Sequence, residues 1–91
     1  MAHSVSLSWN ASLDTVDGYN IYRGAAAGSE ATKLNAALVT TLVFTDPAPS
    51  LGQDFYIVRS SVGGVESPVS NEVSAVILPL PPTGLKVTAS A

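Results

Sequence analysis

The stretch Ser4-Val5-Ser6-Leu7-Ser8-Trp9 decides the fold of this chain. Apolar and hydroxyl side chains alternate strictly along it, and a repeat of two residues is that of a β-strand with one buried face. Val5, Leu7 and Trp9 therefore share a face that we expect in the core. An indole ring also suits the stacking of a sugar, but the place of Trp9 in this alternation favours core packing.

The same period continues through most of the chain and is broken by turn residues. Gly63-Gly64 marks a tight turn, and Pro47 ends a strand because proline cannot donate to a ladder. No stretch has the length and pattern of a helix. The predicted strands are 4–9, 18–23, 32–35, 38–45, 54–62 and 70–78, with Tyr19, Ile21, Leu42, Phe44, Val73, Ala75 and Ile77 facing inward. Short strands at this spacing predict an all-β sandwich of six to seven antiparallel strands.

The strand at 54–62 is apolar on both of its sides, so alternation alone does not decide which side faces the core. If Phe55 and Ile57 pointed inward, Arg59 would follow them and bury an unpaired guanidinium, which is costly. We therefore expect Tyr56 and Val58 to face the core. A bulge near Phe55 would reverse this assignment.

Composition excludes several classes of function. The net charge is −3, and the four basic residues are scattered, so the basic stripe of a nucleic-acid binder is absent and anionic membranes are disfavoured. There is no cysteine, which excludes disulfides and thiolate metal sites. No apolar run is long enough to span a bilayer. No signal peptide is seen, and Met1-Ala2 is compatible with the start of an excised fragment.

Candidate chemical sites are weak. His3 is the sole histidine and lies at a terminus, where a catalytic base is poorly held. Asp14 and Asp17 could contribute to a calcium site, but six to eight oxygens are needed, so solvated turn residues are the favoured interpretation. Asn10-Ala11-Ser12 is a glycosylation sequon. Tyr22 is the best candidate for an exposed aromatic. We expect no catalytic residue, cofactor or metal.

Several segments together resemble a fibronectin type III domain, an immunoglobulin-like fold. They are Val5–Trp9 as strand B, Gly18–Arg23 as strand C, Phe44-Thr45-Asp46 as strand E, Gly52–Val62 as strand F, and Glu66–Val73 as the entry to strand G. The chain is compact, has no disulfide and is rich in Ser, Thr and Ala, and in this it is similar to bacterial members of that family, which occur in secreted multidomain enzymes and surface proteins. The resemblance implies an extracellular or cell-surface location. It also implies a tyrosine corner, which falls on Phe55 in one alignment and on Tyr56 in the other.

The order of strands departs from that family. Residues 81–88, Pro-Pro-Thr-Gly-Leu-Lys-Val-Thr, match the family's strand A but follow strand G instead of preceding strand B. A fragment boundary cut one strand late in a tandem array would explain this arrangement. The sequence thus predicts a body over residues 1–78 and, over residues 79–91, a proline-rich linker followed by a strand-like tail.

The tail alternates, with Leu85, Val87 and Ala89 on one face. We expect it to complete the vacant edge beside Val5 and Leu7 in a neighbouring molecule. There are two alternatives: a monomer with a disordered tail, and a dimer whose two molecules exchange tails. Head-to-tail donation would give either a closed ring or an open filament.

The resulting hypothesis is a non-catalytic structural spacer or interaction module of a larger extracellular bacterial protein. Its partners would be copies of itself, assembled head-to-tail, or adjacent domains of a parent chain. The alternative is a carbohydrate- or protein-binding module that uses the loops at 10–17 and 61–67, which such a fold gathers at one end.

Overall fold

The computed structural model describes residues 3–89, and the predictions that concern Met1, Ala2, Ser90 and Ala91 lie outside that range. The described residues form strands, turns and loops without helix. The strands are β1 (Val5–Ser8), β2 (Gly18–Gly24), β3 (Thr32–Lys33), β4 (Val43–Asp46), β5 (Gly52–Val62), β6 (Val65–Glu66) and β7 (Val73–Ile77). The all-β prediction is confirmed.

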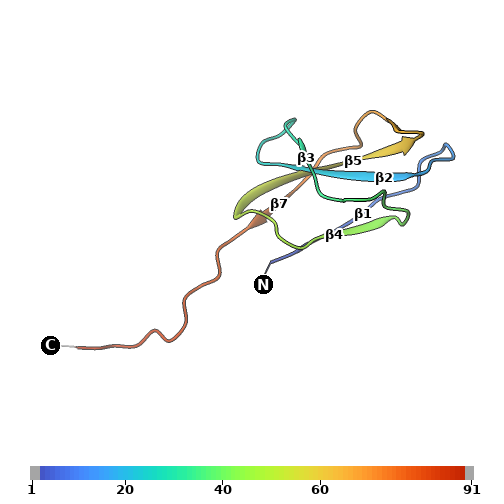
Figure 1. Cartoon of the computed structure of the whole chain (residues 1–91). Helices are drawn as coiled ribbons and strands as arrows, with labels where there is room; N and C mark the ends of the chain where they lie inside the picture. Colours follow the sequence, from blue (N-terminus) through green and yellow to red (C-terminus); the bar gives the residue numbers. More distant parts are fainter. Residues whose placement is uncertain (1–2, 90–91) are drawn as a thin grey trace.

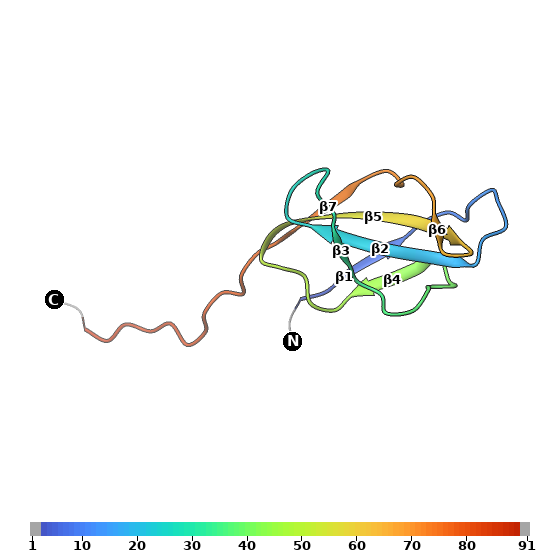
Figure 2. The same ribbon diagram turned by 45° about the horizontal axis from the view of Figure 1, so that its top comes forward.

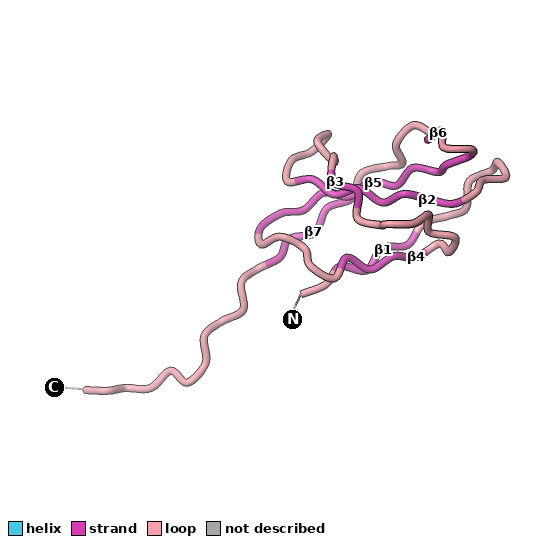
Figure 3. The backbone as a smooth tube through the Cα atoms, in the orientation of Figure 1, coloured by secondary structure: helices cyan, strands magenta, loops and turns pink. Residues whose placement is uncertain are grey.

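The strands form two antiparallel sheets, which lie as two layers (Figures 1 and 3). β1 and β4 make a two-stranded sheet, with Val5 opposite Asp46 and Ser8 opposite Val43. The second sheet has the order β3-β2-β5-β6, and β7 pairs with β5 on the same side as β6. Between β6 and β7 the backbone N–H groups of Ser67 and Ser70 donate to the carbonyls of Ser60 and Val58, so this segment continues the edge.

The predicted facing of β5 is confirmed for its inner side. Tyr56 is 1% exposed and Val58 pairs with the fully buried Ile21 of β2. Arg59 faces outward, where its guanidinium donates to the carbonyl of Ser67 at 2.8 Å. The avoided cost of a buried, unpaired charge accounts for this choice.

Ile57 lies on the opposite, outer side of β5, in keeping with the predicted facing, yet it is only 4% exposed. The loop after β2 crosses the outer side of β5 to reach the β7 side, where the Gly28 N–H donates to Glu72 at 2.8 Å. Ile57 lies between Tyr22 on β2 and the position of Glu72. A loop therefore buries a residue that alternation alone assigns to the surface.

Two predicted core residues are exposed. Val73 shares the inward face of Tyr56 but is 45% exposed, and Leu42 lies just before β4 at 38%. Phe44, Val5, Leu7 and Trp9 are half-buried. The two-stranded sheet is too narrow to cover the larger sheet completely, so the inward residues on one flank remain open.

The tail leaves the body as an extended segment (Figures 1 and 2). Residues 78–89 are exposed and form no strand. Val5 pairs with Asp46, Ile77 pairs with Gly52, and the turn from Asp46 to Gly52 joins those two partners. The start of β1 and the end of β7 therefore share one end of the body, which we call the exit pole; the opposite end, with Trp9 and the Gly63-Gly64 turn, is the far pole.

Candidate functional site

The most unusual feature of the body is the free edge of β1. Within residues 3–89, β1 pairs with β4 alone, so the backbone groups on its other side have no strand partner. An unpaired edge is a template for the addition of another strand. Val5 and Leu7, the body residues predicted for strand exchange, lie on this strand with inward, half-buried side chains.

A groove runs between β1 and the chain segment that leads into β7; we call it the open flank. One hollow of about 60 Å³ and a second of about 140 Å³ meet at Trp9, Val58 and Ser70. The first hollow also reaches Leu7, Tyr56 and Val73, and the second extends past Trp9 to Tyr19, Ser12 and Pro68. The open flank is thus lined by side chains that were predicted to be core and by a similar number of other residues, most of them serines.

Trp9 forms the centre of the open flank. Its ring meets Tyr19 edge-on, with centroids 5.7 Å apart and an interplanar angle of 62°, an arrangement that favours aromatic pairs. This contact supports core packing over a sugar platform. The indole Nε1 is buried and has no hydrogen-bond partner, which is costly for a donor.

The tail carries the matching apolar face, but it is not brought to β1 within the same chain. Leu85 is 97% exposed and Val87 is 81% exposed, and Ala89 is exposed as well. The alternation of apolar residues in the sequence predicted these side chains, and those of Val5 and Leu7, for the strand-exchange interface. It did not predict that Val58 and Val73 line the groove, because their exposure depends on which neighbouring strand is missing.

A polar network closes the exit pole between the two sheets. Asp46, which is 2% exposed, accepts hydrogen bonds at Oδ2 from Arg23 Nη1 at 2.7 Å and from the Tyr56 hydroxyl at 2.8 Å. Its Oδ1 accepts the Ala48 N–H at 3.1 Å. Burial alone would raise the pKa of Asp46, but these hydrogen bonds hold that pKa below its usual value. Burial and the bond to Asp46 raise the pKa of Tyr56.

This network bears on the tyrosine corner that the resemblance implies. Tyr56 makes a buried hydrogen bond through its hydroxyl. The acceptor is the side chain of Asp46, ten residues upstream, rather than a backbone group. The contact ties β5 to the end of β4 and so joins the two sheets.

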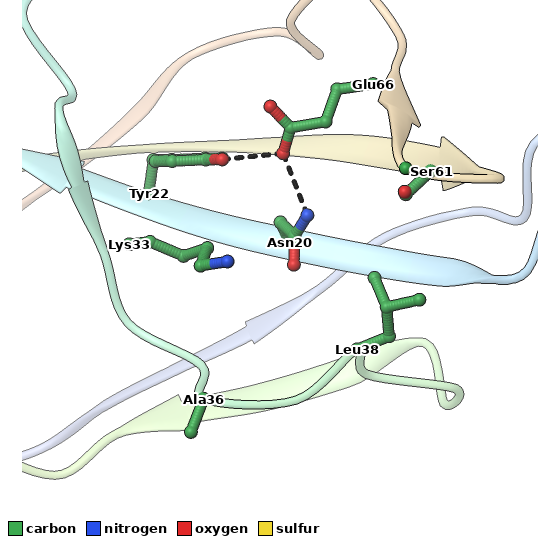
Figure 4. Close-up of a pocket in the computed structure, with 8 residues that line it drawn as sticks. Asn20, Tyr22, Lys33, Ala36, Leu38, Ser61 and Glu66 are labelled. Atoms are coloured by element: carbon green, nitrogen blue, oxygen red, sulfur yellow. Dashed lines mark hydrogen bonds between the residues drawn. The ribbon is translucent and has the colours of Figure 1, made fainter.

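A second concavity lies on the outer face of the larger sheet (Figure 4). Glu66 Oε2 accepts from Tyr22 at 2.6 Å and from Asn20 at 2.8 Å, and these bonds lower the pKa of Glu66. The buried Asn35 donates to Asn20 Oδ1 at 2.8 Å and accepts the Ile21 N–H. Tyr22 is therefore half-buried and committed to a bond within the sheet, rather than the freely exposed aromatic that was expected.

The residues considered above as weak candidates for a chemical site lie in turns or before β1. Asp17 Oδ2 accepts the N–H of Gly63 at 2.8 Å and so supports the tight turn, whose two glycines have positive φ. The Asp14 N–H donates to Ser12 Oγ at 3.2 Å. His3 precedes β1, and Asn10 is exposed. Nowhere in residues 3–89 do three His, Cys, Asp or Glu side chains gather to hold a metal ion. The described part of the chain also has no helix long and apolar enough to cross a membrane.

No family model, curated protein or solved structure matches this chain.

Proposed function

We propose that this chain is a non-catalytic module that self-associates by donating its C-terminal tail as a strand to a neighbouring copy. In this proposal the body is a fibronectin type III-like sandwich without one edge strand. Its role is that of a spacer or interaction module in a larger extracellular bacterial protein.

The observation that carries the proposal is that the tail fits the unpaired edge of β1 and the groove beside it. The free edge of β1 borders a groove lined by Leu7, Trp9 and Val58. The tail offers Leu85 and Val87 on one face, both almost fully exposed. A strand laid along β1 would pair its backbone and fill the groove at the same time, which is the usual physics of strand addition.

The tail of the same molecule is badly placed to fill the groove antiparallel to β1. It leaves at the exit pole, whereas an antiparallel strand must enter beside Trp9 at the far pole. On β5, Gly52 lies opposite Ile77 and Ser60 lies opposite Tyr19, on which Trp9 packs. Those eight residue steps amount to about 27 Å, whereas the linker from Pro79 to Thr83 spans only about 15 Å in a polyproline conformation.

The energetic balance predicts association that depends on concentration. Burial of Leu85 and Val87 contributes about 1.5–3 kcal/mol each. Ordering the backbone of the tail opposes this by about 1–2 kcal/mol per residue, and association carries a further entropic cost. Backbone pairing and closure of the groove around Trp9 supply the remainder, so we expect moderate rather than tight binding.

A pair of tail variants tests the proposal. Val87→Asp places a charge on the face that would enter the groove, whereas Thr88→Asp places the same charge on the opposite face. We expect the first to abolish self-association and the second to preserve it, measured by analytical ultracentrifugation of the full chain. Equal behaviour of the two variants would contradict strand donation, because a non-specific contact does not distinguish the faces of a strand.

A further inference from the structure

We infer that the donated tail pairs antiparallel to β1, with Leu85 seated at Trp9, Val87 at Leu7 and Ala89 at Val5. This inference rests on the proposed function and specifies how the partner molecule is recognised. It also decides whether the assembly is open or closed.

The sizes of the side chains fix the direction. The hollows of the open flank lie at Leu7 and Trp9. One of about 140 Å³ extends beyond Trp9 toward the far pole, and the largest, an open recess of about 390 Å³, lies beside Trp9 between Asn10 and Asn71. Along the tail the inward side chains diminish from Leu85 to Val87 to Ala89. Antiparallel pairing brings the largest side chain to the largest hollow. Parallel pairing would place Leu85 at Val5, where the two sheets are already joined by the Asp46 network, and would leave the small Ala89 at Trp9.

The buried donor of Trp9 independently supports the addition of a strand at this point of the groove. Trp9 Nε1 has no partner in the isolated chain, although buried polar groups are almost always hydrogen-bonded. A strand that enters the groove beside Trp9 brings backbone carbonyls, which are acceptors for this N–H. In the antiparallel arrangement the segment around Gly84 reaches this point, and Gly84, with a φ of 72°, allows the chain to turn from the linker into the groove.

The backbone pattern of the body agrees with this direction. The strand pairs described for this chain are all antiparallel, and antiparallel ladders are slightly more stable per residue than parallel ones. The outward residues of the docked tail, Lys86 and Thr88, would lie beside the hydroxyl side chains of Ser8 and Ser6, a polar row facing solvent.

The direction of pairing determines the symmetry. An antiparallel tail enters the acceptor at the far pole, so the exit pole of one molecule faces the far pole of the next. This contact is heterologous and propagates as an open chain of molecules unless its rotation closes a ring. A parallel tail would enter at the exit pole, so two exit poles would face each other and exchange tails in a closed twofold dimer.

Paired cysteine variants of the full chain distinguish the two directions, because the native chain has no cysteine. In the antiparallel register Ser8 lies opposite Lys86, whereas in the matching parallel register Ser6 does. We therefore compare Ser8→Cys/Lys86→Cys with Ser6→Cys/Lys86→Cys under mild oxidation, on a non-reducing gel. We expect the first variant to form a ladder of covalent oligomers and the second to remain largely unlinked.

The other outcomes separate failure of the direction from failure of the function. Covalent dimers from Ser6→Cys/Lys86→Cys alone would overturn antiparallel pairing but leave strand donation intact. Cross-links within single molecules, or none in either variant together with a monomeric mass, would overturn strand donation itself. Emission of Trp9, the single tryptophan, offers an independent readout: it should shift to shorter wavelength as association proceeds.

Discussion

Tyr56→Phe removes one hydroxyl from the network at the exit pole and leaves the packing of the ring unchanged. Tyr56 is 1% exposed, and its hydroxyl donates to Asp46, itself 2% exposed, at 2.8 Å. Water cannot replace the lost donor at such a buried carboxylate. A hydrogen bond to a charged group contributes about 1.5–3 kcal/mol, and we expect a loss in this range from the free energy of unfolding. With a urea slope of about 1–3 kcal/mol/M, the midpoint should fall by about 1 M.

The effect should depend on pH, since the pKa of Asp46 is depressed in the folded protein against the opposing effect of its burial. The carboxylate contributes stability above its unfolded pKa, near 3.9, and loses that contribution as the pH falls through the folded pKa. Without the Tyr56 hydroxyl the pKa of Asp46 is depressed less. The stabilities of the native protein and of Tyr56→Phe should therefore differ most at neutral pH and converge below about pH 4.

Tyr22→Phe is the matched control. Its hydroxyl also donates to a carboxylate, that of Glu66, but on the exposed outer face of the sheet. There water can replace the lost donor, and we expect a loss below about 1 kcal/mol. Equal losses from the two variants, or a Tyr56→Phe difference that does not change with pH, would refute the assignment of Asp46 as a buried, ionised acceptor.

Three further outcomes are expected. Trp9→Ala should lower the free energy of unfolding by about 3 kcal/mol, measured in urea, and an unchanged midpoint would remove Trp9 from the core. Gly24→Ala should destabilise more than Gly28→Ala, as urea titrations of both variants would show. A Cβ at Gly24 would clash with the backbone carbonyl of Ser29, whereas a Cβ at Gly28 would meet open space and only the positive φ would oppose it. EDTA should leave the melting temperature unchanged, in keeping with the lack of a metal-ligand cluster in residues 3–89, and a clear drop would contradict this.

Alternation predicted the strands well where one face of a strand meets the core and the other meets water. Val5 and Leu7 on β1 are the examples, since Ser6 and Ser8 on the other face are exposed. It gave the facing of Ile57 but not its burial, because the loop that covers this residue is held by a contact between Gly28 and Glu72, which are distant in sequence. It failed for Val73 for the opposite reason: the side chain faces inward, but no neighbouring strand covers it.

The candidate site was predictable only in part. The periodicity of the tail and of β1 pointed to Leu85, Val87, Val5 and Leu7, since both segments have an apolar face. The hollow at Trp9 depends on how far the segment before β7 stands from β1, and no local pattern encodes that distance. The polar network around Asp46 likewise joins residues from three strands and could not be inferred from spacing along the chain.

The most direct test of strand donation is the mass of the full chain in solution as a function of concentration. Static light scattering from the micromolar to the millimolar range should show a weight-average mass that rises steadily above that of the monomer. A peptide of residues 80–91 added in excess should lower this mass by occupying the groove of each molecule. A constant monomer mass over the whole range, together with sharp NMR signals from a mobile tail, would contradict the account.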